Sequence, residues 1–296
     1  MYSLETVALT KRFGGFTALS GIDLKVNEGE VFGYIGPNGA GKTTTIRVLL
    51  GILRATEGDA KVFGMDAWKD AVEIHKRIAY VPGDVNLWPN LTGGEVIDLF
   101  VSLRGKADKQ LREKLLNLFD LDPSKKCRTY SKGNRQKVAL AAAFASDADL
   151  YILDEPTSGL DPLMEQVFQE CVLAQKKRGK GIFLSSHILS EVERLCDRVG
   201  IIREGKLVET GTLSQLRHLT RITMNIETET PVQGLERLGC VHDVSERQGG
   251  LSFQVDSNEI GRVVAHIASF GVTKLESTPP TLEDLFIRHY NVGGGV

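Results

Sequence analysis

Eight consecutive residues in the first quarter of the chain have the composition of a phosphate-binding loop. They match G-x-x-x-x-G-K-[ST] in full and read Gly36-Pro37-Asn38-Gly39-Ala40-Gly41-Lys42-Thr43. Glycines let the backbone wrap so that successive N–H groups point at phosphate oxygens, and a Cβ would block that approach. Lys42 can reach the β- and γ-phosphates of a nucleotide, and the Thr43 hydroxyl can bind Mg²⁺. The residue types therefore predict a nucleotide site.

Two consecutive carboxylates could supply the chemistry that a phosphate loop lacks. Asp154 and Glu155 directly follow the apolar run 150–153. At the end of a strand beside the phosphate loop, Asp154 would hold Mg²⁺ or one of its waters. Glu155 points differently and could polarise the attacking water as a general base. Alone, the pair fits a strand-to-turn junction with solvated acids equally well, and the phosphate loop is what favours hydrolysis.

Three further motifs complete a pattern that one known family shares. Tyr130–Lys137 contains a glycine-bearing loop that opens a helix, Ser158–Asp161 follows the carboxylates, and His187 follows two serines. In order and spacing, these segments resemble the signature, the D-loop and the switch histidine of the ATP-binding subunits of ABC transporters. The similarity covers roughly residues 2–217. A metabolic kinase also needs a phosphate loop, but it would not need the signature.

This resemblance implies a role for each matching residue. It predicts an ATPase that uses ATP and Mg²⁺, with ATP held between two chains in a head-to-tail dimer. The implied catalytic residues are Glu155, His187 and Lys42, and the implied metal ligands are Thr43 and Asp154. The implied nucleotide contacts begin with an adenine-stacking aromatic and continue through the loop motifs: Phe13, Gly36, Pro37, Asn38, Gly39, Ala40, Gly41, Lys42, Thr43, Thr44, Ser131, Lys132, Gly133, Asn134 and Asp161.

The sequence departs from the family pattern in two places. The signature carries Lys132 where glycine is usual and Asn134 where glutamine is usual. A lysine beside phosphate is electrostatically favourable, so we interpret this as subfamily variation. After residues 80–82 the family places a glutamine that contacts Mg²⁺, whereas this chain has Gly83 followed by Asp84. The role of that glutamine does not transfer to Gly83, and Asp84 or a water would have to replace it.

The resemblance also implies a membrane partner. In the family, the region that corresponds to residues 85–100 meets the coupling helix of a transmembrane permease. This segment contains Leu87 and Trp88 in a polar loop, and packing of Trp88 as local core is an equally good interpretation from sequence alone. The permease chooses the exported substrate, so the sequence does not name it.

The motifs require an α/β framework to bring them together. Residues 30–35 and 43–50 predict a strand and a helix on either side of the phosphate loop, the opening of a mostly parallel sheet. Residues 1–24 predict an antiparallel β patch, and residues 84–146 a helical subdomain. The remaining expected elements are buried strands at 150–153, 181–185 and 199–203, and helices at 94–104, 109–119, 162–178 and 188–196. We therefore expect a P-loop NTPase cassette over residues 1–219.

A second, smaller α+β domain is expected over residues 220–296. Its predicted order is strand, helix, strand, strand, helix, strand, the ferredoxin-like arrangement, with the first helix at 232–238. An amphipathic helix at 282–290 follows two prolines. The charge changes at the same boundary, because residues 221–296 carry 6 basic and 10 acidic side chains. We interpret this domain as a dimer-supporting or stabilising appendage rather than a ligand sensor.

The composition excludes several other classes of protein. The chain has 296 residues, 42% hydrophobic and 25% charged, which is typical of a globular protein and excludes disorder. Its net charge of −2 predicts no nucleic-acid partner. The four scattered cysteines argue against a disulfide framework or a zinc site. The longest apolar run, 138–145, is too short for a membrane helix, and no secretory signal follows Met1.

These features lead to one functional prediction and one alternative. We predict the ATP-hydrolysing subunit of an exporter of the drug and antibiotic type, at the cytoplasmic face of the membrane and bound to a separate permease. It would act by ATP-driven closure and opening of a dimer with itself or a homologue. The alternative is an ABC-type ATPase switch that acts on a non-membrane partner, although the two cassettes or long heptad arms of such proteins are missing here.

Overall fold

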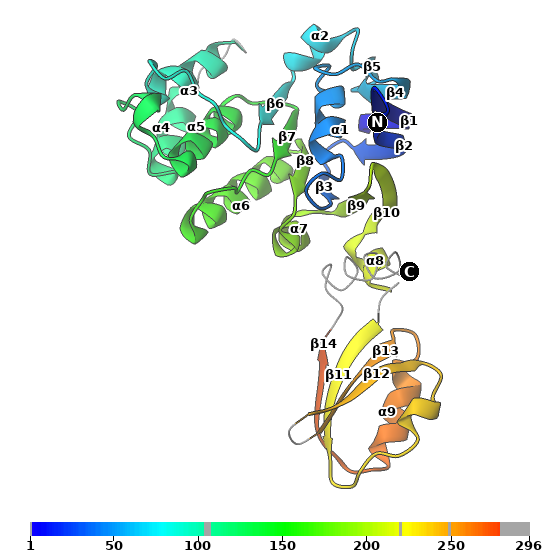
Figure 1. Ribbon diagram of the computed structural model, residues 1–296. Helices are drawn as coiled ribbons and strands as arrows, with labels where there is room; N and C mark the ends of the chain where they lie inside the picture. The colour runs from blue at the N-terminus through cyan, green and yellow to red at the C-terminus, as the bar shows by residue number, and fades with distance from the viewer. Residues whose placement is uncertain (1, 104–107, 219–220, 248–249, 279–296) are drawn as a thin grey trace. The chain divides into compact units, whose positions relative to one another are not determined.

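The computed structural model describes residues 2–103, 108–218, 221–247 and 250–278 (Figure 1). The chain divides into two compact units, Met1–Thr210 and Gly211–Val296. Each unit has its own hydrophobic core. The helix predicted at residues 282–290 lies outside the described residues.

A six-stranded sheet forms the centre of the first unit. In spatial order its strands are β10 (Lys206–Thr212), β9 (Arg198–Arg203), β3 (Val31–Ile35), β8 (Gly181–Ser186), β7 (Leu150–Asp154) and β6 (Ile78–Val81). The pairs β9–β3, β3–β8, β8–β7 and β7–β6 are parallel. The predicted mostly parallel sheet is therefore confirmed. The strands β3, β8 and β7 are neighbours and run in the same direction, so their C-terminal ends lie side by side. The phosphate loop, which follows β3, and the two carboxylates at the end of β7 therefore come to the same end of the sheet.

The strands of this sheet are apolar because both faces are covered. Every residue of β3, β7 and β8 is buried. Phe32 and Phe183 stack with their ring centroids 6.0 Å apart, and Tyr34 packs against Phe183 at 5.3 Å. Parallel sheets buried on two sides need such continuous hydrophobic runs, and the runs in the sequence located these strands correctly.

The predicted antiparallel β patch is a four-stranded sheet. It contains, in spatial order, β2 (Phe16–Asn27), β1 (Tyr2–Phe13), β4 (Glu57–Val62) and β5 (Met65–Asp66). The helix α1 (Lys42–Leu49) contacts both β2 and β4. It begins directly after the phosphate loop, so its N-terminus points the first-turn N–H groups towards that loop.

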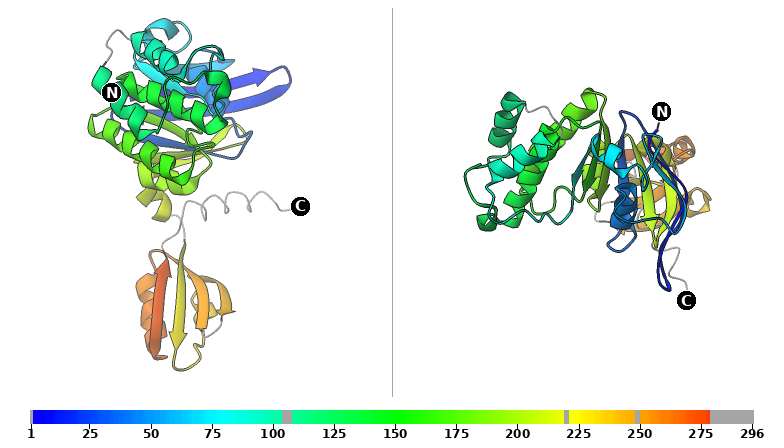
Figure 2. Two further views of the ribbon diagram at one scale, coloured as in Figure 1. Left: turned by 90° about the vertical axis from the view of Figure 1, so that its left-hand side faces the viewer. Right: turned by 90° about the horizontal axis from the view of Figure 1, so that it is seen from above.

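The helices of the first unit fall into two groups (Figures 1 and 2). One group contains α3 (Gly93–Ser102), α4 (Lys109–Leu118), η1 (Cys127–Thr129) and α5 (Lys132–Ala145). Its helices gather on one side of the unit beside β6, as predicted for the helical subdomain. The other helices are α2 (Ala71–His75), which contacts β6, and α6 (Pro162–Lys177) and α7 (Leu189–Leu195), which contact β8.

Side-chain caps fix where several helices of this unit begin. Thr92 accepts a hydrogen bond from the Glu95 backbone at 3.1 Å, and the Glu95 carboxylate accepts one from the Thr92 backbone at 2.6 Å. This capping box satisfies two backbone donors at the start of α3. Ser131 caps α5, and Asp161 caps α6 with Pro162 in the first turn. Two of these caps, Ser131 and Asp161, are predicted site residues.

The second unit contains a four-stranded antiparallel sheet with helices. Its elements are α8 (Leu213–His218), β11 (Arg221–Thr228), η2 (Leu235–Arg237), β12 (Val241–Arg247), β13 (Gly250–Asp256), α9 (Ile260–Ala268) and β14 (Val272–Thr278). The strand order β12-β13-β11-β14 is that of the ferredoxin-like arrangement. The helix predicted at 232–238 is wrong, because only the short η2 forms there. Gly234 has a φ of +73°, in the left-handed region, so a regular right-handed helix cannot run through this residue.

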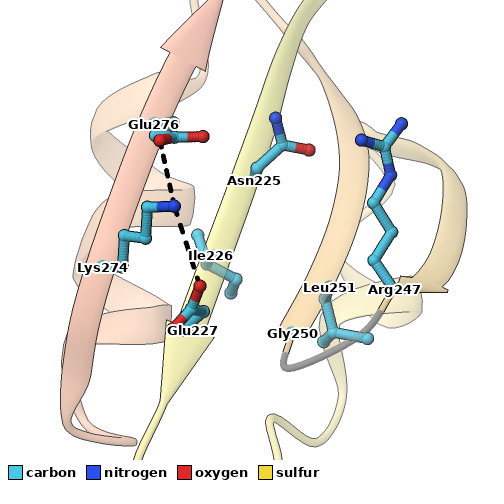
Figure 3. Close-up of a pocket in the computed structure, with 8 residues that line it drawn as sticks. All are labelled: Asn225, Ile226, Glu227, Arg247, Gly250, Leu251, Lys274 and Glu276. Carbon is cyan, nitrogen blue, oxygen red and sulfur yellow. Dashed lines mark ion pairs between the residues drawn. The ribbon is translucent and has the colours of Figure 1, made fainter.

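The two faces of this second sheet differ in chemistry. Figures 1 and 2 show α9 on one face, where Val263 and Ile267 pack into the core with Phe253. The other face carries polar side chains around a pocket of about 180 Å³ (Figure 3). There Lys274 forms ion pairs with Glu276 at 3.1 Å and with Glu227 at 3.8 Å, and the two carboxylates raise the pKa of Lys274. The positive charge of Lys274 is therefore balanced by these two carboxylates.

Candidate functional site

The phosphate loop joins the end of β3 to the start of α1. A Cβ at Gly36 would lie 2.4 Å from the Ile202 carbonyl oxygen, and one at Gly41 would lie 2.8 Å from the Leu19 side chain. Gly41 also has a φ of +113°, which L side chains rarely adopt. Two glycines of the motif are therefore required by packing as well as by the approach of a phosphate. Asn38 and Gly39 form the exposed tip of the loop.

Lys42 is folded back over this loop. Its Nζ donates to the Gly36 carbonyl at 2.6 Å and to the Pro37 carbonyl at 3.3 Å. It also lies 3.1 Å from Glu155 Oε1, and the residue is only 5% exposed. Such a buried ammonium group needs several oxygen partners. Phosphate oxygens offer the same kind of partner with more charge, so this amine is placed to exchange its present acceptors for phosphate.

Asp154 and Thr43 meet although they are far apart in the sequence. The Thr43 hydroxyl donates to Asp154 Oδ2 at 3.0 Å, and the Ser185 hydroxyl donates to Asp154 Oδ1. Asp154 is directly paired with Ser185 in the β7–β8 register, which explains the second contact. Burial, with a smaller contribution from the charge of Asp154, raises the pKa of Tyr80 to about 12. Tyr80 therefore stays a neutral phenol at physiological pH.

These oxygen atoms fit the chemistry of a magnesium site. Mg²⁺ is bound in nucleotide enzymes by one or two protein oxygens together with phosphate oxygens and waters, rather than by a cage of side chains. A hydroxyl and a buried carboxylate 3.0 Å apart supply that donor set. Within the described part of the chain, no group of three or more His, Cys, Asp or Glu side chains could hold a metal ion, so a closed all-protein site is not present there.

Glu155 and His187 form the centre of the site. Glu155 has a φ of +49°, a strained conformation for a side chain of this size. Its backbone N–H donates to the Ser185 carbonyl at 3.0 Å, which holds the turn against β8. Its Oε2 hydrogen-bonds to His187 Nδ1, while its Oε1 faces Lys42. Because a carboxylate only accepts hydrogen bonds, Nδ1 is the donor, and His187 Nε2 is left to face other groups.

The predicted signature packs against the turn that follows Glu155. Ser131 accepts a hydrogen bond from the Asn134 backbone at 3.2 Å, and Lys132 Nζ donates to the Ser158 hydroxyl at 2.8 Å. A Cβ at Gly133 would lie 2.5 Å from the Gly159 carbonyl oxygen. Only glycine therefore lets the first turn of α5 lie so close to this turn.

Three further predicted nucleotide contacts come from the end of β1, the start of α6 and the first turn of α1. Phe13 ends β1, pairs with Phe16 across the hairpin and is 47% exposed, with Lys11 Nζ 5.0 Å from its ring centroid. An exposed ring is available to stack on a base. Asp161 accepts a hydrogen bond from the Met164 backbone at 3.0 Å as the cap of α6. Thr44, half-buried, lies in the first turn of α1.

Gly83, the departure from the family pattern, lies directly against the backbone of Asp154 and the Cβ of Glu155. A Cβ at this position would be 3.2 Å from the Asp154 carbonyl oxygen and 3.4 Å from Glu155 Cβ. The backbone of this segment thus borders the site even though it carries no side chain. Asp84, the next residue, is exposed.

Some residues of the site were not predicted from the sequence. Ser185 holds Asp154, Gln136 donates to the Pro156 carbonyl at 2.9 Å, and Ser158 accepts from Lys132. Ser185 ends an apolar run of the sequence, but its contact with Asp154 depends on the register in which β7 and β8 pair. The contacts of Gln136 and Ser158 depend on how α5 docks, for which the sequence has no local signal.

Comparisons with known proteins place these features in a family. A family model described as ABC transporter matches residues 19–158, and one described as ATP-binding protein DrrA1-3-like, C-terminal domain, matches residues 211–290. The bacitracin transport ATP-binding protein BcrA of Bacillus licheniformis is 32% identical over 99% of this chain and 98% of its own. A probable multidrug ABC transporter ATP-binding protein of Escherichia coli, YbhF, is 31% identical over 81% of this chain and 42% of its own.

Solved structures show the same relationship. A structure titled as the ATP binding subunit of an ABC transporter has a TM-score of 0.68 and 34% identity, and it covers 73% of this chain and 92% of its own. The match along nearly the whole length of BcrA decides the assignment, because it includes both units of the fold. The chain therefore belongs to the ATP-binding proteins of ABC transporters, and it is an ATPase that binds ATP.

Proposed function

We propose that this chain powers export through a separate transmembrane permease, by ATP-driven closure and opening of a dimer. The observation that carries the proposal is the meeting of Lys42, Glu155 and His187 at one edge of the parallel sheet. The bacitracin and multidrug relatives support export as the direction and a drug or antibiotic as the class of cargo. No helix within the described residues is long and apolar enough to cross a membrane.

The phosphate end of ATP is held by the loop and by α1. Backbone N–H groups of the loop and the N-terminus of α1 bind phosphate oxygens, and Lys42 moves from its carbonyl and carboxylate partners to the β- and γ-phosphates. Thr43 and Asp154 would hold Mg²⁺, which when bound neutralises charge on the phosphate oxygens. Phe13 stacks on the adenine ring. Each of these contacts orients the terminal phosphate for attack.

Glu155 acts as the general base and His187 holds the γ-phosphate or the attacking water. Once Lys42 turns to phosphate, Glu155 Oε1 is released to accept a proton from water. The hydrogen bond to His187 keeps the carboxylate oriented, because Nδ1 donates to its other oxygen. The imidazole Nε2 then faces the phosphate. The pair thus combines a base with a group that positions its target.

A second chain completes the nucleotide site. Ser131 and Lys132 are exposed, and Gly133 and Asn134 are half-buried, so the first turn of α5 is accessible to a partner. Its backbone N–H groups and the Lys132 ammonium suit the γ-phosphate of ATP bound by the other subunit. ATP is then a ligand shared by two subunits, and its hydrolysis releases them. The second subunit is another copy of this chain or a homologue.

The permease docks in an apolar groove of the first unit. The groove has a volume of about 530 Å³ and lies between α2, β6 and the helices α3 and α5. Three of its apolar side chains are largely exposed, namely Val72 at 73%, Leu103 at 72% and Phe100 at 40%. Exposed apolar surface of this kind marks an interaction site. A short amphipathic helix of the permease is the occupant that we propose, as the family resemblance implies for this region.

Trp88 lies at the edge of this groove. Its ring centroid is 6.1 Å from that of Phe100, and the residue is 52% exposed. Leu87 lines the groove directly. This placement favours the docking interpretation of residues 85–100 over a role of Trp88 in the local core. Residues 220–296 act as an accessory domain that supports the dimer.

A charge placed in the groove is expected to separate hydrolysis from transport. Leu87→Asp should reduce ATP-dependent transport about 10-fold or more, because an unpaired carboxylate in an apolar interface costs a few kcal/mol. Basal ATPase activity of the isolated chain should stay within about 2-fold. Leu87 lines the groove and is none of the residues proposed to bind ATP or to act in its hydrolysis. The measurements are transport by membrane vesicles and phosphate release by the purified chain.

Val208→Asp is the matched control, because Val208 is an exposed apolar residue on β10 outside the groove. It should leave both transport and ATPase activity unchanged. If Leu87→Asp transports at the rate of the control, the groove is not the docking site.

The permease itself is identified by purification of the tagged chain from detergent-solubilised membranes of its host. We expect a protein with several membrane-spanning helices to copurify in fixed proportion and to raise the ATPase rate. Recovery of the chain with a non-membrane protein instead would support the alternative, an ABC-type ATPase switch.

A further inference from the structure

Glu191 is a buried acidic side chain next to the site that the mechanism does not use. It lies on α7, and the residue is only 4% exposed. Its neighbours on this helix, Val192 and Leu195, are buried apolar residues of the core. A carboxyl group in such a position normally has a specific partner, because burial of an unpaired polar group is costly.

The first partner of Glu191 is the segment that carries His187. The Ser186 hydroxyl donates to Glu191 Oε2 at 2.8 Å. The same hydroxyl accepts a hydrogen bond from the Ile188 backbone N–H at 3.0 Å. Ser186 and Ile188 are the two chain neighbours of His187. The carboxyl of Glu191 therefore fixes the backbone on both sides of the histidine.

The second partner is the turn that follows Glu155. The hydroxyl of Thr157, itself buried, lies close enough to lower the pKa of Glu191 by hydrogen bonding. Glu191 Oε1 nonetheless meets no donor at full hydrogen-bond geometry within the described residues. This turn is closed by the Ser158 N–H, which donates to the Glu155 carbonyl at 3.1 Å. Glu191 thus lies behind both segments whose side chains, His187 and Glu155, meet in the site.

Charged groups around Glu191 disfavour its ionised form. Burial is the largest effect and, with the nearby carboxylates of Glu165 on α6 and Glu155, outweighs the hydrogen bonds from Ser186 and Thr157, so the pKa of Glu191 is raised to about 7. Cys196, at the end of α7, is a neutral thiol whose own pKa is raised by burial. From β3, the titratable side chain is Tyr34, whose hydroxyl pairs with Thr45 at 3.2 Å. Glu191 therefore changes its charge in the physiological range.

We propose that Glu191 is a positioning residue of the ATPase site, which holds the segment bearing His187 and the turn behind Glu155 in one fixed arrangement. This inference rests on the roles proposed above for those two residues. With Glu191 in place, Ser186 has one orientation, and the His187 imidazole is held against the Glu155 carboxylate. Without it, the two segments lose their shared anchor and the histidine is free to turn away.

The decisive experiment is a double-mutant cycle on ATP turnover. Glu191→Ala should lower kcat about 10-fold with little change in the KM for ATP, the size typical of residues that orient a ligating or catalytic group. In the His187→Ala background, the same change should cost clearly less than in the parent, because the part of its effect that passes through His187 is already lost. Glu193→Ala, on the same helix, is the control and should leave kcat unchanged.

The conservative variant Glu191→Gln adds a pH readout. An amide keeps the size of the side chain and can accept from Ser186, but it stays neutral. Below pH 7, where Glu191 is protonated, the variant and the parent should have equal kcat. Above pH 7 the parent should be faster by about 3-fold, because an ionised carboxylate is a stronger acceptor than an amide. The kcat ratio of the two proteins is measured from pH 5.5 to 8.5.

The stability of the same variant tests whether the carboxyl ionises inside the folded protein. The pKa of Glu191 is raised from its ordinary 4.5 to about 7, so its favourable contribution is complete below pH 4.5 and is lost as the pH rises to 7. Glu191→Gln should therefore gain in Tm relative to the parent between pH 5 and pH 8. A Tm difference that does not change with pH would show that Glu191 does not titrate there, against the proposal.

The outcomes separate this inference from the proposed function. Equal, additive losses from Glu191→Ala in both backgrounds, or a kcat ratio for Glu191→Gln that is independent of pH, would show a merely structural role. If His187→Ala itself keeps full activity, His187 has no role in hydrolysis. That result would contradict the proposed function and not the positioning role of Glu191.

Discussion

Replacement of Glu155 with glutamine is expected to lower kcat for ATP hydrolysis by about 100-fold or more while leaving ATP binding intact. Glutamine has the same shape, and its amide can still contact His187, but it cannot accept a proton from water. The positive φ of Glu155 and the contact of its N–H with Ser185 are backbone features that the substitution keeps. The loss should therefore be confined to the chemical step.

The measurement is phosphate release under saturating ATP, together with nucleotide affinity by titration. Glu170→Gln, an exposed glutamate on α6, is the control and should retain full turnover. ATP affinity of Glu155→Gln should equal that of the parent or exceed it, because removal of the carboxylate frees Lys42 from its 3.1 Å ion pair. Turnover within about 3-fold of the parent would remove Glu155 as the base and leave the role of His187 without its partner.

Replacement of Lys42 with methionine is expected to weaken ATP binding by about 100-fold, because the ammonium makes charge-assisted hydrogen bonds to two phosphates. Methionine keeps the length of the stem. The affinity for ADP should fall less than that for ATP, since the γ-phosphate contact is absent in both proteins for that ligand. Binding is measured by titration with each nucleotide, and Lys69→Met, at an exposed surface lysine, is the control.

The Lys42 substitution has a second consequence for the folded protein. It leaves Glu155 Oε1, which is buried, facing no cation. Addition of Glu155→Gln should therefore restore part of any loss in Tm, although it cannot restore ATP binding. If Lys42→Met binds ATP as tightly as the parent does, the amine does not reach phosphate and the phosphate-loop interpretation is wrong.

The sequence predicted those parts of the molecule that depend on local chemistry. The glycines around Lys42 and the apolar strand before Asp154 both have local signals. The strand order of the second unit also follows from its pattern of strands and helices. The helix expected at 232–238 is wrong, because the left-handed backbone of Gly234 interrupts the apolar spacing there.

Contacts that depend on register and docking could not be predicted. Ser185 faces Asp154 because β7 and β8 pair in one register out of several that the apolar runs would allow. Lys132 meets Ser158 because α5 lies against the turn after Glu155, a matter of packing between distant segments. Glu191 has the sequence position of a solvated helix residue, and only the fold shows that it is buried. Such tertiary contacts connect the motifs into one site.

We propose that ATP joins two of these subunits and that hydrolysis separates them. The most direct test is the molar mass of purified Glu155→Gln by light scattering, with and without ATP and Mg²⁺. We expect the mass of one chain without nucleotide and of two chains with ATP, while the same variant carrying Lys42→Met stays at one chain throughout. A mass that does not change when ATP is bound, with binding verified by titration, would contradict it.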